Sequence, residues 1–239
     1  MLSVLSYNIR YGKKLKKIVD WLSLLPTSFD ILCFQEFPLE KVGYLLGSLT
    51  KVSYKHSFAS GFFRNNKPYG QLTVINTDKI QLRNSKAISL GESSFIERKI
   101  FKTKGERSAL ITTLLYQNKA FILVNTYLIC FALNKARIRQ INTITAALSH
   151  DLLKTPTIIL GDFNYSSLRK KGLLEFMKRY QFQDGTGKLP THKLLMFTSL
   201  LTHQIDYVFY KSCMVKNATV MKKIKYSDHY PLRFTLELY

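Results

Sequence analysis

Acidic residues are scarce in this sequence. Asp and Glu together number 15, against 36 Lys and Arg, which gives a formal net charge of +21 at pH 7. Such a charge favours a polyanionic partner. Nucleic acid is the usual one, because neutralising its phosphates releases counterions and supplies affinity for any base sequence. An anionic membrane surface, and a basic protein with no polyanionic partner, remain as alternatives.

Cysteine is also rare, and the three that occur form no recognisable pattern. Cys33, Cys130 and Cys213 are odd in number and far apart, and Cys33 lies inside an apolar run. A disulfide framework and a zinc site are therefore both disfavoured, and a reducing compartment is expected.

Long hydrophobic runs are absent as well. Apolar stretches such as residues 127–133 are far shorter than the roughly 20 residues that a membrane-spanning helix needs. The N-terminal residues carry neither a basic region nor a small-residue cleavage site, so no cleaved signal peptide is expected. These absences predict a cytoplasmic protein, with export by a route that uses no N-terminal signal as the alternative.

The apolar residues that are present predict a mixture of strands and helices. A chain of 239 residues with 46% apolar content can bury a substantial core, so residues 1–239 are expected to form a single domain, with a monomer as the default state. The pattern indicates an α/β or α+β fold in which helices cover two stacked sheets. Strands are expected at 4–9, 31–35, 54–59, 72–76, 80–89, 98–103, 109–116, 121–128, 157–160, 205–210, 219–223 and 232–238, and helices at 14–25, 42–49, 134–148 and 173–180.

Four of the few carboxylates stand at or next to the ends of predicted buried strands: Glu36, Asp162, Asp206 and Asp228. A carboxylate in such a place needs a cation, a hydrogen-bond network or solvent. Several of them at one end of a sheet would make a site for a hard cation, because Mg²⁺ prefers oxygen ligands.

Each of these short motifs also has a simple structural explanation. The sequence GDFN at 161–164 is compatible with an Asx turn after a strand, and SDH at 227–229 with an ordinary loop. A single histidine such as His229 is more often structural than catalytic. The order of all the segments along the chain is the stronger signal.

That ordered set resembles the endonuclease/exonuclease/phosphatase superfamily, which includes deoxyribonuclease I-like enzymes, abasic-site endonucleases, neutral sphingomyelinases and inositol polyphosphate 5-phosphatases. The resemblance extends over nearly the whole chain and is specific for the superfamily rather than for one of its members. The matching segments are SYNIR (6–10), LCFQE (32–36), VNTYL (124–128), RIRQ (137–140), GDFN (161–164), IDYVF (205–209) and SDHYPL (227–232).

The resemblance implies a four-layered α/β/β/α sandwich of two packed mixed sheets, with the site at one edge of the sheets. It implies Mg²⁺, or Mn²⁺, as the cofactor. The implied roles are metal binding for Glu36, Asn8 and Asp228, phosphate binding for Asn8 and Asn164, activation of water for Asp162, and charge stabilisation or proton transfer for His229, positioned by Asp206.

Two positions depart from the family pattern. Tyr127 stands where many members have a histidine that serves as a second acid, although abasic-site endonucleases are similar in placing Tyr there. A phenol can donate a hydrogen bond to phosphate or protonate a leaving group, although its pKa near 10 makes it a weaker general acid than imidazole. The alternative is that Tyr127 packs in the core. Gln204 stands where a basic residue often precedes the IDY motif.

These features together predict hydrolysis of nucleic-acid phosphodiesters, with DNA favoured over RNA. Lysine and arginine clusters at 13–17, 169–171 and 222–225 would line a backbone-binding groove, and residues 54–69 mix aromatic and basic side chains as a substrate-facing loop does. A phosphoinositide phosphatase or sphingomyelinase at an anionic membrane is the first alternative. A catalytically silent binding module is the second, although all seven polar site residues are retained.

Overall fold

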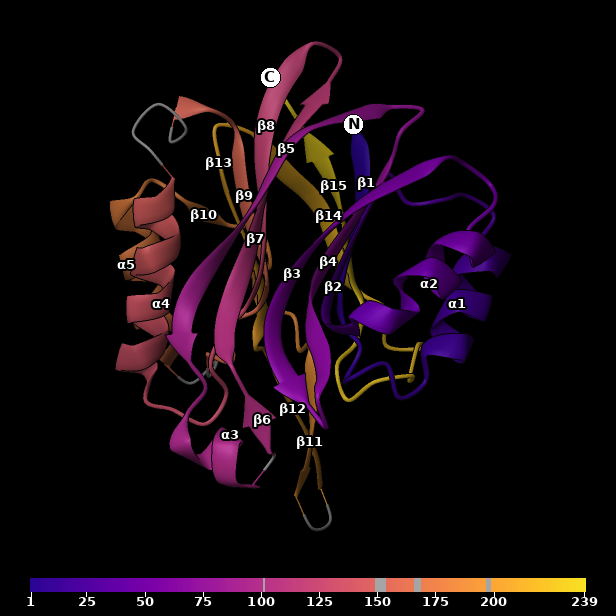
Figure 1. Cartoon of the computed structure of the whole chain (residues 1–239). Coiled ribbons are helices and arrows are strands. Elements are labelled where there is room, and N and C mark those ends of the chain that lie inside the picture. The colour runs from indigo at the N-terminus through magenta and orange to yellow at the C-terminus, as the bar shows by residue number, and fades with distance from the viewer. Residues whose placement is uncertain (101, 149–153, 166–168, 197–198) are drawn as a thin grey trace.

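Two β-sheets packed face to face form the centre of the molecule (Figure 1). The structure is a computed structural model that describes residues 1–100, 102–148, 154–165, 169–196 and 199–239. One sheet has seven strands in the order β14-β15-β1-β2-β4-β3-β6, and the other has six in the order β10-β13-β9-β8-β7-β5. A two-stranded hairpin, β11-β12, stands apart from both sheets.

The strands of the seven-stranded sheet are β1 (Leu2–Asn8), β2 (Ile31–Pro38), β3 (Tyr54–Arg64), β4 (Lys67–Asn76), β6 (Thr103–Lys104), β14 (Met214–Val220) and β15 (Leu232–Glu237). Those of the six-stranded sheet are β5 (Ile80–Glu92), β7 (Glu106–Tyr116), β8 (Lys119–Tyr127), β9 (Thr157–Asp162), β10 (Gln183–Asp184) and β13 (Asp206–Lys211). The hairpin consists of β11 (His192–Met196) and β12 (Ser199–His203).

Helices cover the outer face of each sheet, which confirms the predicted α/β/β/α sandwich (Figure 1). Helices α1 (Leu15–Leu24) and α2 (Val42–Ser48), with the short 3₁₀ helix η1 (Leu39–Lys41), lie on the seven-stranded sheet, and α4 (Asn134–Ala147) and α5 (Lys170–Arg179) lie on the six-stranded sheet. The short helix α3 (Phe95–Ile100) lies beside β6 at one end of the sheets. Within the described residues, none of these helices has the length and apolar character needed to cross a bilayer.

The apolar core has three parts, as the layers require. Side chains such as Val4, Cys33 and Leu123 fill the space between the two sheets. On either side, Ile18 of α1 packs on the seven-stranded sheet and Ile144 of α4 packs on the six-stranded sheet. Because the central strands β2 and β8 bury both faces, the runs at 31–37 and 121–128 are almost continuously apolar.

The strand predicted at 98–103 is wrong for most of its length. Residues 95–100 form α3 instead, and only Thr103 begins a short strand; Phe101 lies outside the described residues. The helix has a capping box: Ser94 Oγ accepts the N–H of Glu97 at 3.2 Å, and Glu97 Oε2 accepts the N–H of Ser94 at 2.7 Å. These reciprocal bonds satisfy N–H groups at the helix start and outweigh the local strand propensity.

Two further segments differ from the sequence prediction. Residues 54–69, expected to include a substrate-facing loop, form the long hairpin β3-β4, which turns at Asn65 and Asn66 with positive φ angles of 50° and 58°. The strand predicted at 219–223 lies earlier, as β14, with a register irregularity between Lys216 and Thr219.

Candidate active site

Asn8 connects the two sheets at the edge where their central strands end. It is fully buried at the end of β1, and its amide nitrogen donates hydrogen bonds to Glu36 Oε1 at 3.0 Å and to Asp162 Oδ2 at 2.9 Å. Its oxygen accepts the backbone N–H of Arg10 at 3.0 Å. Because β1 and β2 run parallel, as do β8 and β9, residues far apart in sequence meet at this edge.

Unusual backbone geometry brings the two carboxylates into place. Glu36 has a φ of 55° at an irregularity of β2 between Phe34 and Phe37, so its side chain leaves the normal alternation of the strand. Gly161 has a φ of 130°, and a Cβ there would lie 2.1 Å from the carbonyl oxygen of Thr126. Only glycine therefore allows β9 to approach β8 so closely just before Asp162.

His229 lies between two aspartates. Its Nδ1 is 2.9 Å from Asp206 Oδ2 and 3.1 Å from Oδ1, and its Nε2 is 3.6 Å from Asp162 Oδ2. Asp206 and Asp162 are directly paired across β13 and β9, which fixes their spacing. The contact with Asp206 requires a proton on Nδ1, so Nε2 is the ring atom that faces Asp162.

Burial and charge shift the pKa values of these groups in opposite senses. Burial raises the pKa of Asp162 to about 7, against the lowering effect of His229. Burial alone would lower the pKa of His229, but Asp206 and Asp162 outweigh it and raise that pKa to about 10. At neutral pH the imidazole is therefore cationic, whereas Asp162 titrates near the range in which a carboxylate is an effective general base.

Glu36 is a buried carboxylate of the site with one oxygen left unsatisfied. Its Oε2 is buried and has no hydrogen-bond partner among the described residues, and burial raises the pKa of its carboxyl. Asp162, Asp206 and His229 also form a buried group whose ligand atoms lie within 4.8 Å of one another and could hold a metal. In that group, however, Asp206 already accepts from His229, whereas the orphaned Glu36 oxygen is free for a hard cation.

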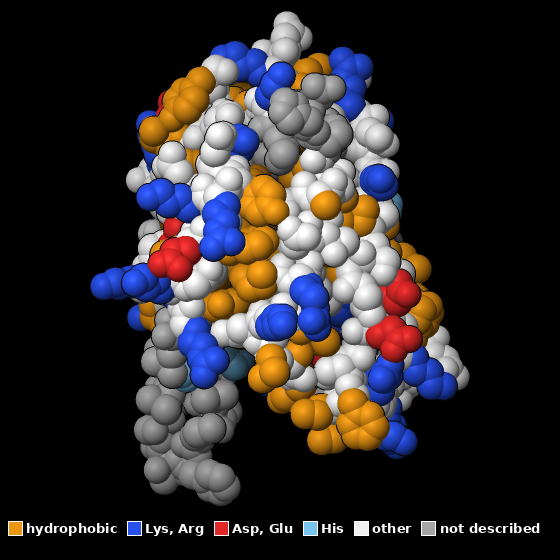
Figure 2. Space-filling model, turned by 90° about the vertical axis from the view of Figure 1, so that its left-hand side faces the viewer, with side chains coloured by type: hydrophobic (Ala, Val, Ile, Leu, Met, Phe, Trp, Pro, Cys, Tyr) orange, Lys and Arg blue, Asp and Glu red, His pale blue; other side chains and the backbone are white. Residues whose placement is uncertain are grey.

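A cavity of about 580 Å³ opens over these residues. Figure 2 shows the edge of the molecule hollowed, with a histidine side chain on the wall of the hollow. Asn8 and Asp206 lie behind the wall of the cavity. Asn8 holds Glu36 and Asp162, and Asp206 holds His229, and these three residues reach the cavity. Six of the predicted site residues line the cavity, namely Glu36, Tyr127, Asp162, Asn164, Asp228 and His229, together with the basic residues Arg10, Lys13, Arg64 and Arg107.

Asn164 and Asp228 flank the central group. The backbone N–H of Asn164 donates to Asp162 Oδ1 at 2.8 Å in an Asx turn, and its amide nitrogen donates to the carbonyl of Leu128 at 3.0 Å. Asp228 Oδ2 lies 3.2 Å from Arg10 Nε. Burial raises the pKa of Asp228, but His229 and Arg10 outweigh it and hold the carboxyl below its usual range.

Arg107 is a site residue that the sequence analysis missed. Its guanidinium lies 4.4 Å from the ring centre of Tyr127 and 4.8 Å from that of Phe62, and it forms a buried ion pair with Glu97 of α3. Its Nε and Nη1 are buried and have no partner among the described residues. Burial, then the negative charge of Glu36, raises the pKa of Tyr127 well above that of a free phenol.

His192 is a second residue that was missed. It pairs with His229 in an isolated bridge, and the two rings are 4.7 Å apart. Burial, then the neighbouring His229, lowers the pKa of His192 to about 4, so it is neutral beside the cationic ring. The sequence gives no clear sign of the hairpin that carries His192, because residues 194–196 form only a short apolar run.

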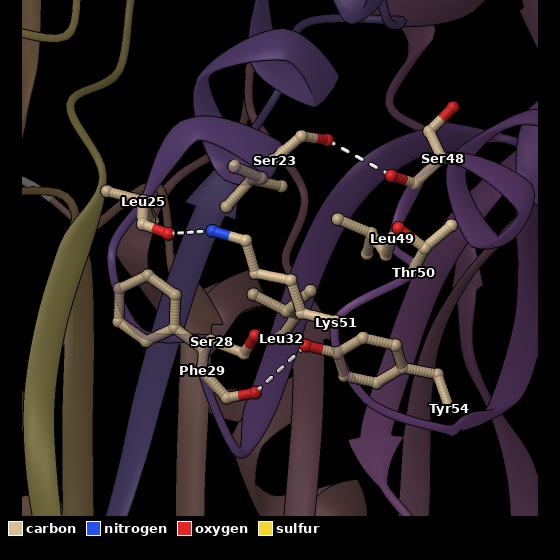
Figure 3. A pocket seen from close by; sticks show the side chains of 11 residues that line it. Ser23, Leu25, Ser28, Phe29, Leu32, Ser48, Leu49, Thr50, Lys51 and Tyr54 are labelled. Atoms are coloured by element: carbon tan, nitrogen blue, oxygen red, sulfur yellow. Dashed lines mark hydrogen bonds between the residues drawn. The ribbon is translucent and has the colours of Figure 1, made fainter.

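A second, smaller cavity lies beneath α1 and α2 (Figure 3). Its volume is about 50 Å³, too small for a substrate. Its polar groups are bonded across it: Ser23 Oγ donates to the carbonyl of Ser48 at 3.1 Å, Tyr54 to that of Phe29 at 3.2 Å, and Lys51 to that of Leu25. This cavity is part of the packing between the helices and the sheet.

A sandwich of this kind, with acids, an amide and a histidine at one sheet edge, is the architecture of enzymes that hydrolyse phosphoester bonds. The chain belongs to the endonuclease/exonuclease/phosphatase family, whose model matches residues 5–229. No curated protein matches the sequence.

Several solved structures share the fold at low sequence identity. A family member from Leptotrichia buccalis has a TM-score of 0.77 and 15% identity, over 100% of both chains. A mannosyl-6-phosphatase from Bacteroides thetaiotaomicron has a TM-score of 0.72 and 18% identity, over 99% of both. TDP2 from D. rerio, in complex with a single-stranded DNA product, has a TM-score of 0.74 and 15% identity, over 99% of this chain and 98% of that one.

Proposed function

We propose that the protein is a divalent-metal-dependent phosphodiesterase that hydrolyses nucleic acid, with DNA preferred over RNA. One observation carries the proposal. A single cleft is lined by Asp162, by His229, which Asp206 holds from behind, and by Glu36 with its orphaned oxygen. Its walls also carry Arg10, Lys13, Arg64 and Arg107.

The donor set fits a hard cation such as Mg²⁺ or Mn²⁺. Glu36 is the main ligand in this proposal, because its Oε2 is buried without a partner. Asn8 and Asp228 stay predicted as further ligands; Asn8 would have to turn its amide, since its nitrogen now faces both carboxylates. When bound, the cation supplies charge neutralisation on the non-bridging oxygens of the phosphate.

The protein groups divide the remaining work. Asp162 orients the attacking water and accepts its proton, because burial brings its pKa close to 7. His229, held cationic by Asp206, stabilises the negative charge that develops on the phosphate. Asn164 contacts the phosphate, and Tyr127 donates a hydrogen bond rather than a proton, because its pKa is too high for efficient proton transfer.

Charge supports nucleic acid as the substrate. The net charge of +21 suits a polyanion, and of the basic residues that line the cleft Lys13 and Arg64 form no ion pair with a described residue. A structural neighbour, TDP2, is bound to a single-stranded DNA product. Another neighbour is a mannosyl-6-phosphatase, so the same fold also serves a phosphomonoesterase, and a phosphate carried on a sugar or a lipid headgroup is the alternative substrate.

A side-by-side assay with Mg²⁺ tests the proposal. Plasmid, abasic duplex, single-stranded DNA, RNA, a phosphoinositide and mannose 6-phosphate are offered at equal concentration. We expect cleavage of DNA, stopped by EDTA and by His229→Ala. Release of phosphate from the phosphoinositide or the sugar, with all nucleic acids intact, would contradict the nuclease assignment. Metal-independent binding without turnover would indicate a silent module.

A further inference from the structure

A further hollow, of about 690 Å³, lies beside α5, outside the catalytic cleft. Its floor is apolar and consists of Leu174, Leu189 and Pro190. Its rim is basic: Glu175 is the only acidic residue among its described lining residues, against the four lysines Lys170, Lys171, Lys178 and Lys188. Figure 2 shows that the face carrying α4 and α5 has many basic side chains and few acidic ones.

A thin ridge of chain separates this hollow from the catalytic cleft. Pro190 and Gln204 face the hollow, whereas His192 and Ile205, one or two residues further along the chain, face the cleft. Thr191 fixes the ridge, since its Oγ1 accepts the N–H groups of Ile205 at 3.2 Å and of the catalytic Asp206 at 3.0 Å. A nucleic-acid strand that crosses this ridge would therefore keep a fixed position relative to His229.

The lysines of the rim differ in how they are occupied. Lys170 is held by Asp184 at 2.7 Å and by Gln204 Oε1 at 3.2 Å, so it is part of the wall. Lys178 and Lys188 form no ion pair with any described residue, and Lys171 has only a 3.9 Å contact with the exposed Glu175. Three ammonium groups are thus available to a ligand.

Gln204 gives an independent indication that the hollow receives a polar group. The residue is only 5% exposed and lines the hollow, and its Nε2 has no hydrogen-bond partner among the described residues. A buried amide donor without a partner is costly unless a ligand or water satisfies it. Its position also departs from the family pattern, in which a basic residue often stands there.

We propose that this lysine hollow is a subsite for a nucleotide of the bound strand that lies outside the scissile linkage. Lys171, Lys178 and Lys188 bind its phosphate, and the apolar floor contacts its sugar and base. An apolar surface bordered by cations suits a nucleotide better than a free phosphate, which would leave the floor unused. The inference rests on the proposed function, because it makes the hollow a continuation of the catalytic cleft.

The test uses the full chain with the double substitution Lys178→Gln and Lys188→Gln. The matched control, Lys119→Gln with Lys154→Gln, removes the same charge at the opposite end of β8 and β9. Binding of a fluorescent single-stranded oligonucleotide is measured by anisotropy in EDTA, where no cleavage occurs. Hydrolysis of bis(p-nitrophenyl) phosphate with Mg²⁺ reports the scissile site alone, because this small ester does not reach the hollow.

We expect the hollow variant to weaken oligonucleotide binding about tenfold and to reduce the salt dependence by about one to two lysine contacts. The control should change binding less than about twofold, and both should hydrolyse the small ester at the wild-type rate. Equal effects of the two pairs would overturn the subsite. Binding of inorganic phosphate is measured for the same variants. If the hollow variant loses phosphate binding as much as it loses oligonucleotide binding, the hollow is a simple anion site and the subsite is also overturned.

The two proposals fail in different ways. If the wild-type protein binds the oligonucleotide but Mg²⁺ produces no cleavage, the proposed function fails, and the EDTA titration still decides the subsite. If cleavage occurs and the hollow variant cleaves and binds like the control, only the subsite fails.

Discussion

Asp206 holds the imidazole of His229 with both carboxylate oxygens, at 2.9 and 3.1 Å from Nδ1, and so directs Nε2 toward Asp162. Asp206 is itself fixed by its pairing with Asp162 across two antiparallel strands. The orientation and the charge of the histidine thus depend on one neighbouring carboxylate.

Asp206→Asn should lower kcat by about 10² to 10⁴-fold, by analogy with other carboxylate–histidine pairs. It should also change the pH profile. Asp206 raises the pKa of His229, so its loss lowers that pKa, and the variant should lose activity at lower pH than the wild type on the alkaline side. kcat measured from pH 6 to 10 tests this; an unchanged alkaline limb would contradict it. His229→Ala is the control and should show no cleavage at any pH.

Glu36→Gln should separate metal binding from folding. The variant removes a buried carboxylate whose pKa is raised, so without metal it should be at least as stable as the wild type. Millimolar Mg²⁺ should stabilise the wild type, by about 2.7 kcal/mol at a hundred times the dissociation constant, and leave the variant unchanged. Thermal unfolding with and without Mg²⁺ measures both effects. Equal stabilisation of the two proteins would exclude Glu36 as a ligand.

Tyr127→Phe should reduce kcat by less than about tenfold, because a phenol with so high a pKa contributes a hydrogen bond rather than proton transfer. Tyr127→Ala should cost more, since it also removes the ring on which Arg107 lies. Steady-state rates of the two variants decide this. A thousandfold loss for the Phe variant alone would assign Tyr127 a role as general acid.

Arg107→Met should destabilise the fold by about 3 kcal/mol, because Glu97 would be left buried without its partner. The double variant Arg107→Met with Glu97→Gln should regain much of that loss, since no unpaired charge remains. Urea denaturation gives both free energies of unfolding. If the second substitution adds a further loss instead, the ion pair is not the source of the effect.

Asp30→Asn should destabilise the protein at neutral pH by about 1 to 2 kcal/mol. Asp30 accepts hydrogen bonds from the Ser3 N–H at 2.8 Å and Oγ at 2.9 Å, and Lys79 lies 2.9 Å away. Burial raises the pKa of Asp30, but these partners outweigh it and hold the pKa below its usual range. A carboxyl whose pKa is lower in the folded state stabilises the fold at pH values above its unfolded-state pKa. The difference in stability between the wild type and the variant should therefore vanish as the pH falls through the folded-state pKa. Asp78→Asn is the exposed control and should change stability little at any pH.

Much of the fold followed from the sequence because its signals are local. Continuous apolar runs identified β2, β8 and β9, and helical spacing identified α1 and α4. The site residues were predicted because their short motifs stand next to predicted strands and, taken in order, resemble the family; their roles stay predictions. The single-domain, monomeric and cytoplasmic assignments stay predictions.

The features that were missed depend on contacts distant in sequence. Arg107 looked like an ordinary residue at the start of a strand, and its role becomes visible only when α3 brings Glu97 to it and β8 brings Tyr127. The start of α3 did carry a local signal, the capping box from Ser94 to Glu97, which the apolar and β-branched residues around it concealed. The lysine hollow likewise arises only where α5 meets residues 188–190.

The central claim is that Glu36 and His229 form one metal-dependent site for nucleic-acid phosphodiesters. The most direct measurement is the initial rate of cleavage of a labelled DNA strand as Mg²⁺ is titrated, for the wild type and for Glu36→Gln. The account predicts no cleavage in EDTA, saturable activation of the wild type, and at least about 100-fold less activity in the variant at every Mg²⁺ concentration. Equal rates for the two proteins, or cleavage that persists in EDTA, would contradict it.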